Sequence, residues 1–265
     1  MDMGAGLVKT LALPRLAVGL LRYSGGLALD LLYPPVCLNC DAPVATADAL
    51  CGRCFSTLRP ITAPLCPRLG IPFAVPIGYG ALSAEAIADP PPFERSRSAV
   101  LYNAVARHIV ARLKYGDRPE LARFCAGLMA GAGHELFADR PVLVPVPLHR
   151  TRQFTRRYNQ STELARALAR TTGLTVDPIL VGRSRRTAQQ VGLSASARQR
   201  NVAGAFVARA DALERLRGRH VVLVDDVITT GATVKAVTRA LNRVGVLHVD
   251  VISFARVVVG EDDPI

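Results

Sequence analysis

The sequence of 265 residues contains no tryptophan, and aromatic residues make up only 5% of it. Acidic residues are scarce too: 21 Asp and Glu stand against 33 Lys and Arg, a formal net charge of +12. Half of the residues are apolar, which excludes a chain too polar to bury a core. The basic excess indicates anionic partners, such as phosphorylated metabolites, nucleic acid or an acidic membrane face, or a solvated basic surface without a dedicated partner.

Long uninterrupted apolar runs are also missing. The first 33 residues are apolar and basic, but Pro14, Arg15 and Arg22 break them up, so no stretch reaches the roughly 20 residues of a membrane helix. No small-residue cleavage site follows the apolar run, although a signal peptide is the alternative interpretation. We expect an N-terminal segment, 1–33, with a helix near 16–32 that packs on the body, no membrane span, and a cytoplasmic location.

Apolar patterning divides the rest of the chain. A cysteine-bearing segment with little core of its own covers 34–75, and a loose stretch ending in Pro90-Pro91-Pro92 follows as a linker or exposed loop. From 95 to 260, strand-like and helical patterns alternate, which predicts an α/β domain with a mainly parallel sheet flanked by helices. The expected strands are 142–146, 221–224 and 249–254, and the expected helices are 162–169 and 232–244. No internal repeat is visible.

Two Cys-x-x-Cys pairs lie close together in the cysteine-bearing segment. Cys37 and Cys40 form one pair, and Cys51 and Cys54 form the other. Two such pairs complete a tetrahedral thiolate site for zinc, which would be structural because no ligand position is left open. Disulfides and buried free thiols are the alternatives. Cys66 and Cys125 are not expected to be ligands.

The strongest functional signal is VVLVDDVITTGAT, residues 221–233. A buried strand leads to Asp225 and Asp226, which we expect at its carboxyl end, where open α/β sheets bind ligands. A turn then opens a helix whose unpaired N–H groups favour a phosphate. The expected phosphate-binding residues are Thr229, Thr230, Gly231, Ala232 and Thr233.

An acid pair beside an anion site suits a phosphorylated ribose, because carboxylates accept hydrogen bonds from the sugar hydroxyls while the turn holds the phosphate. The alternative is a Thr-capped helix that follows a strand ending in solvated acids. Strand, acid pair, turn and helix all agree with the first interpretation.

VVLVDDVITTGAT resembles the binding loop for 5-phosphoribosyl 1-pyrophosphate (PRPP) of type I phosphoribosyltransferases. Over nearly the whole chain, the sequence resembles the ComF family of competence-associated, double-zinc-ribbon proteins. The segments that carry this resemblance are LDLLYPPVCLNC (29–40), CGRC (51–54), RLKYGD (112–117), VPVPLHRTRQFTRRYNQSTELARALA (144–169) and RSRRTAQQVGLSASARQRNVAGAF (183–206). Leu69 stands where the family has a cysteine, so we predict one zinc site rather than two. Arg157 and Tyr158 depart from the family's residues before Asn159.

The resemblance implies a type I phosphoribosyltransferase fold with a small zinc ribbon, and it implies roles for further residues. Asp225 and Asp226 would be catalytic, Mg²⁺ would bind together with PRPP, and 187–201 would form a mobile lid. The further PRPP-binding residues would be His149, Arg150, Arg152, Asn159, Gln190 and Arg198. Helix capping by Asn159 is the alternative for that residue. Lys114 has two interpretations, ligand contact or a helix end with a favourable charge.

Two functions follow from the resemblance. The first is transfer of phosphoribose from PRPP to an acceptor that the residues do not specify. The second is a DNA-uptake component of competence that binds single-stranded DNA, with a regulatory or non-catalytic PRPP site and a DNA-translocating ATPase as partner. Stacking aromatics, expected in a strong single-strand binder, are few.

Overall fold

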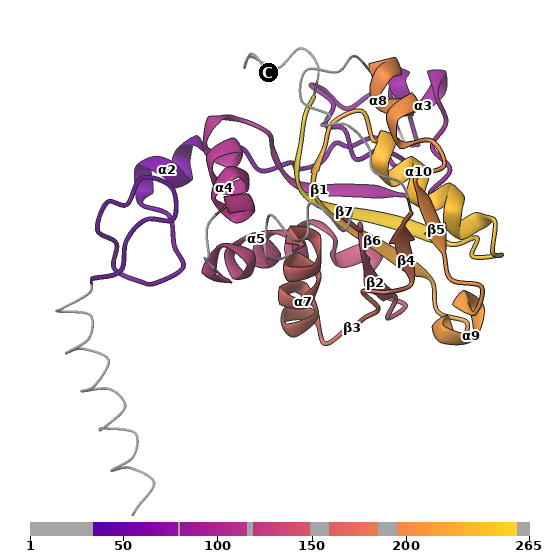
Figure 1. Cartoon of the computed structure of the whole chain (residues 1–265). Helices are drawn as coiled ribbons and strands as arrows, with labels where there is room; N and C mark the ends of the chain where they lie inside the picture. The colour runs from indigo at the N-terminus through magenta and orange to yellow at the C-terminus, as the bar shows by residue number, and fades with distance from the viewer. Residues whose placement is uncertain (1–33, 79, 116–118, 149–158, 185–194, 259–265) are drawn as a thin grey trace, which may run out of the picture.

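A five-stranded parallel sheet forms the centre of the computed structural model, in the order β1-β7-β6-β2-β3 (Figure 1). The structure describes residues 34–78, 80–115, 119–148, 159–184 and 195–258. The expected helix near 16–32 lies outside these residues. The predicted α/β class with a mainly parallel sheet is confirmed.

The central strands β1, β2 and β7 are buried along their whole length, as expected for strands covered on both faces. The strands are β1 (Ser96–Leu101), β2 (Val142–Pro145), β3 (Thr175–Val176), β6 (Val221–Ile228) and β7 (Val249–Arg256). Strand β6 continues four residues beyond the predicted end at Val224. Asp225 and Asp226 therefore lie within the strand, because β7 keeps pairing with β6 as far as Ile228 and Arg256. Strand β2 stops opposite Val224, so the acid pair still lies beyond the end of one neighbour.

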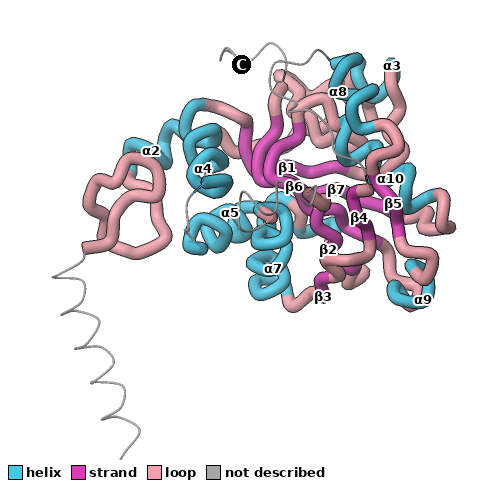
Figure 2. Tube along the Cα trace, viewed as in Figure 1, coloured by secondary structure: helices cyan, strands magenta, loops and turns pink. Residues whose placement is uncertain are grey.

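Three helices cover one face of the sheet: α4 (Ala104–Tyr115), α5 (Pro119–Ala132) and α7 (Gln160–Thr172) (Figure 2). Their apolar side chains share one core with strand residues such as Val222 and Phe254. A short 3-10 helix, η1 (His134–Leu136), follows α5. Helix α7 is longer than the predicted 162–169 and ends at Gly173, whose left-handed backbone caps it.

The other face carries α10 (Ala232–Asn242), α8 (Ala195–Val202) and the antiparallel pair β4 (Val181–Arg183) and β5 (Phe206–Ala208). The short helix α9 (Ala212–Leu216) follows β5. Val234, Val237 and Leu241 of α10 are buried on this face, as their spacing predicts. The two cores lie on opposite sides of the sheet.

The segment before β1 carries two short helices, α2 (Gly52–Thr57) and α3 (Ala84–Ala88). In Figure 1, α2 and the loops beside it extend beyond the sheet next to α4, whereas α3 lies near α8 and α10. Among the described residues, no helix has the length and apolar character needed to cross a membrane.

Candidate functional site

The two adjacent carboxylates of β6 are held by polar contacts rather than left in solvent. The hydroxyl of Ser161, at the start of α7, donates to Oδ1 of Asp225 at 3.1 Å. The backbone N–H of Asp226 donates to the same oxygen at 2.9 Å. Burial, followed by the negative charge of Asp226, raises the pKa of Asp225 to about 7. The pair therefore has a defined geometry, and burial favours the protonated form of Asp225 to a higher pH than for an ordinary aspartate.

Lys114, near the end of α4, forms an ion pair with the second carboxylate. Its Nζ lies 3.0 Å from Oδ2 of Asp226. Burial lowers the pKa of Lys114, but the charges of Asp226 and Asp225 outweigh that effect and raise it above its ordinary value. Lys114 lies in the last turn of α4, as the helix-end interpretation has it, and its charge also contacts the acid pair.

The turn after β6 has the shape expected of an anion-binding helix start. Gly231 precedes α10 with a φ of 72°, a left-handed conformation that side chains disfavour. A Cβ at this position would meet only the side chains of Lys235 and Val234, at ordinary contact distances, so the backbone angle rather than crowding requires glycine. Thr230 Oγ1 accepts from Ala232 N–H at 3.4 Å. The first turn of α10 thus begins at Ala232, after the last residues of β6 and the turn that contains Gly231.

Other predicted site residues are distributed differently. Asn159 caps α7: its Oδ1 accepts from Ser161 N–H at 3.1 Å and its Nδ2 donates to Val146 O at 3.0 Å. Thr229 and Thr233 lie in the turn and in the first turn of α10. His149, Arg150, Arg152 and Gln190 fall outside the described residues, and Arg198 lies in α8, where its side chain is not described.

One contact residue, Ser161, was not singled out from the sequence. Ser161 supports Asp225, and its neighbour Gln160 donates from Nε2 to the backbone oxygen of Lys114 at 3.4 Å. Ser161 is the last residue of the YNQS run, two residues after Asn159. A polar run at the start of a helix that follows a buried strand is a signal that could have identified it.

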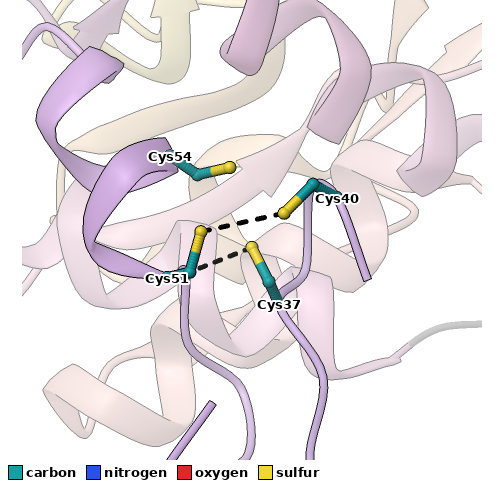
Figure 3. Close-up of side chains that lie close together, drawn as sticks. All are labelled: Cys37, Cys40, Cys51 and Cys54. Carbon is teal, nitrogen blue, oxygen red and sulfur yellow. Dashed lines mark hydrogen bonds between the residues drawn. The ribbon is translucent and has the colours of Figure 1, made fainter. Parts of the chain in front are cut away.

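The four predicted zinc ligands come together in the segment before β1. Their Sγ atoms all lie within 4.8 Å of one another (Figure 3): those of Cys37, Cys40, Cys51 and Cys54. The Sγ atoms of Cys40 and Cys51 are 3.7 Å apart, and Cys51 N–H donates to Cys37 Sγ at 3.2 Å. Burial raises the pKa of Cys37, but backbone N–H groups, including that of Cys51, outweigh it and lower the pKa to about 6. This all-sulfur donor set suits a structural zinc ion.

The cysteine cluster is attached to the domain mainly through α4. Arg112 donates to the backbone oxygens of Leu38 and Asn39, each at 3.1 Å, and pairs with Asp41 at 2.8 Å. Arg112 is two residues before Lys114, so one helical turn contacts both the cysteine cluster and the acid pair.

A hollow of about 460 Å³ lies at the opposite end of the strands. Arg95, His220 and Asp250 line part of it, and Arg95 pairs with the buried Asp250 at 2.6 Å. Because open α/β sheets bind ligands at the carboxyl ends of their strands, the acid pair and the turn after it remain the candidate site.

Comparison with known proteins agrees with this division. A family model described as "Double zinc ribbon domain" matches residues 28–86, and one described as "Phosphoribosyl transferase domain" matches residues 159–264. The cysteine cluster and the first match together support a structural zinc ion. The second match, with the parallel sheet, confirms the phosphoribosyltransferase-type domain.

Relatives match over most of their length. "DNA utilization protein YhgH" of Salmonella typhimurium is 34% identical over 230 residues, covering 83% of this chain and 96% of the relative. "Competence protein F" of Haemophilus influenzae is 28% identical, with the same two coverages. A solved structure titled "Structure of the allosteric regulatory enzyme of purine biosynthesis" aligns over 54% of this chain and 29% of its own, with 23% identity and a TM-score of 0.35. That score is too low to support any conclusion.

Proposed function

Because this chain belongs to the ComF family of double-zinc-ribbon, phosphoribosyltransferase-like proteins, we propose that it binds PRPP and transfers phosphoribose to an acceptor. The observation that carries the proposal is the order of parts on β6 and α10. An acid pair held by Ser161 and Lys114 lies near the end of β6, and the Gly231 turn and the start of α10 follow that strand.

PRPP would lie across the end of β6 and the start of α10. The 5′-phosphate binds at the turn before α10, where N–H groups without helical partners and the helix dipole favour an anion. Asp225 and Asp226 accept hydrogen bonds from the ribose hydroxyls and stabilise the positive charge that develops at C1. Lys114 and Ser161 act as positioning residues, because each contacts a carboxylate rather than the reacting atoms.

The transfer itself requires no protein nucleophile. The bond between C1 and the pyrophosphate oxygen breaks with its electron pair leaving on pyrophosphate, and an acceptor nitrogen bonds to C1 and then loses a proton. The predicted residues His149, Arg150 and Arg152 would hold the pyrophosphate by charge. The predicted lid residues 187–201, including Gln190 and Arg198, would exclude water.

Mg²⁺ fits this site as a companion of the substrate. The described polar groups here include the oxygens of Asp225, Asp226 and Thr230, and magnesium prefers oxygen ligands while keeping several waters and substrate phosphates. The ion would neutralise charge on the pyrophosphate group.

Calorimetric titration of PRPP with Mg²⁺ tests the proposal. We expect binding to the wild type and none to the Asp225→Asn/Asp226→Asn variant. An Asp211→Asn/Glu214→Gln variant, at the start of α9 and within it, removes the same formal charge away from the site and should bind as the wild type does. Equal affinity in the wild type and the Asp225/Asp226 variant would contradict the site assignment.

The cysteine cluster has a separate, structural task in this proposal. Cys37, Cys40, Cys51 and Cys54 hold one zinc ion that stabilises a segment with little apolar core. Cys66 and Cys125 take no part.

A second function, single-stranded DNA binding in DNA uptake, is favoured by different observations. The printed names of the relatives refer to DNA utilization and competence, and the chain carries a net charge of +12. Under this alternative the PRPP site is regulatory. DNA affinity should then fall steeply with salt, whereas pyrophosphate release that depends on an added base would favour the transferase. A DNA-translocating ATPase would be the partner in the uptake role.

A further inference from the structure

The described residues from Pro64 to Ala88 (64–78 and 80–88) repeat the backbone of the cysteine segment, with an offset of 29 residues at the start. An isolated antiparallel bridge joins Val36 to Pro43, and another joins Leu65 to Pro72. No such repeat was visible in the sequence, because few of the matching side chains are alike.

The backbone hydrogen bonds follow the same offset. Cys37 N–H donates to Ala42 O at 2.7 Å, and Cys66 N–H donates to Ile71 O at 2.8 Å. The turn in each copy closes in the same way. Asp41 N–H donates to Cys37 O, and Gly70 N–H donates to Cys66 O. Asp41 has a φ of 58° and Gly70 a φ of 63°, so both residues are left-handed.

The second half of each copy also corresponds. Cys51 caps α2 and its N–H donates to Cys37 Sγ at 3.2 Å, while Ser83 caps α3 and its N–H donates to Cys66 Sγ at 3.4 Å. The backbone angles of the two cap residues agree closely: φ −65° and ψ 160° for Cys51, and φ −68° and ψ 156° for Ser83.

This correspondence shows which residues of the second copy occupy the positions of the four predicted zinc ligands. The residues at the four positions of the first copy are Cys37, Cys40, Cys51 and Cys54, and those of the second copy are Cys66, Leu69, Ser83 and Ala86. Three of the four thiolates are therefore missing from the second copy, and the remaining donor set does not fit zinc. A family with a double zinc ribbon implies a metal in both copies, and this chain departs from it.

Burial explains how the second copy holds its shape. Four residues of the second copy belong to the same core as the apolar side chains of α10, and each is at most 9% exposed: Cys66, Leu69, Ile71 and Ala86. The turn is also fixed directly to the sheet, because Ser96 N–H of β1 donates to Arg68 O at 2.7 Å. Apolar contact with the main core is a sufficient substitute for the ion.

We propose that the second ribbon is a metal-free copy of the first, in which packing against the sheet replaces zinc, and that its backbone still places four residues for a tetrahedral site. The proposal rests on the zinc assignment of the first ribbon. It extends the single-zinc prediction, because it identifies Ser83 and Ala86, beside Leu69, as the positions that have lost a ligand.

Zinc per chain in the purified full-length protein tests the proposal, measured by elemental analysis after removal of loosely bound metal. We expect one zinc in the wild type, one in Cys66→Ala, and two in Leu69→Cys/Ser83→Cys/Ala86→Cys. Cobalt substitution of the triple variant should roughly double the tetrahedral thiolate absorption of the wild type.

Each other result has a distinct meaning. Two zinc ions in the wild type, with one in Cys66→Ala, would overturn the metal-free assignment, whether or not the triple variant folds. A folded triple variant with one zinc would overturn the correspondence of ligand positions. No zinc in the wild type and one in the triple variant would overturn the assignment of the first ribbon and support that of the second.

Discussion

The two ribbon copies have the same backbone but different surroundings. The first lies beside α4 and contributes Leu38 to a core, while its own centre is four sulfur atoms. The second contributes Cys66, Leu69, Ile71 and Ala86 to the core of the sheet. A small unit without a core of its own needs either a metal or a larger neighbour, and this chain shows both solutions.

The difference between the copies also separates two sources of stability. Metal binding in small zinc domains supplies about 10–16 kcal/mol at neutral pH, whereas buried Leu and Ile side chains contribute about 1.5–3 kcal/mol each. The first copy should therefore lose its structure all at once when the ion leaves. The second copy should weaken gradually as individual contacts are removed.

Removing a ligand from the first copy should have the largest effect. We expect Cys54→Ala to abolish zinc retention and to make residues 34–57 sensitive to limited proteolysis, while the sheet keeps its melting transition. The matched change in the second copy is Ala86→Gly, which removes one buried methyl group and should leave the zinc content unchanged. Retention of zinc by Cys54→Ala would contradict the assignment.

The contact of the second copy with β1 should be the next most sensitive point. A Cβ at Gly70 would lie 2.3 Å from Ser96 O, and the residue has a φ of 63°. Gly70→Ala should destabilise the protein by about 2–4 kcal/mol, from left-handed strain and overpacking together. Gly204→Ala is the control, because Gly204 has a φ of 65° but no atom within 4 Å of the added Cβ. Denaturant unfolding that gives equal losses for the two variants would contradict the predicted clash.

The raised pKa of Asp225 should make the sheet less stable as pH rises. The pKa of Asp225 is raised to about 7 from an ordinary 3.8, so between these values the folded protein holds a proton that the unfolded chain has released. Stability from this group therefore falls as pH rises from about 4 to 7. Asp225→Asn should raise the melting temperature at pH 8 by a few degrees more than at pH 4.5.

Asp211 provides a control of opposite sign. Its hydrogen-bonded partner Arg209 lowers the pKa of Asp211, so its contribution is present above the unfolded pKa and is lost as pH falls through the folded one. Asp211→Asn should lower the melting temperature slightly at pH 8. The same pH profile for both variants would contradict the sign of the Asp225 shift.

The smallest expected effect links the first copy to the PRPP site through α4. Arg112 donates to two backbone oxygens of the first ribbon, and Lys114 in the same turn contacts Asp226. We expect Arg112→Gln to weaken PRPP binding a few-fold in the calorimetric titration. Arg123 of α5 pairs with Asp48 of the first ribbon. Arg123→Gln removes that pair and should leave PRPP affinity unchanged, so equal losses of affinity in Arg112→Gln and Arg123→Gln would contradict a route through α4.

The sequence predicted the features that depend on local pattern. The order of apolar strand, acids, turn and helix predicted the candidate site around Asp225 to Thr233. The spacing of the four cysteines predicted a cluster that the structure brings together. The strands 142–146 and 249–254 were placed to within two residues, because short runs rich in Val, Leu and Ile are typical of strands covered on both faces.

Long-range contacts could not be predicted in this way. Strand β6 extends past the acid pair because β7 continues beside it, and only pairing between distant segments determines that. The Ser161 and Lys114 contacts depend on how α7 and α4 pack over the sheet. The ribbon repeat was hidden because its second copy kept the backbone and exchanged metal ligands for core residues.

Hydrogen–deuterium exchange before and after zinc chelation tests the central claim most directly. The account predicts that chelation makes amides of residues 35–57 exchange rapidly, while those of residues 64–88 and of β1 keep their protection. Loss of protection in both copies would contradict the claim that packing against the sheet has replaced the metal in the second, and unchanged protection in both would contradict the dependence of the first on zinc.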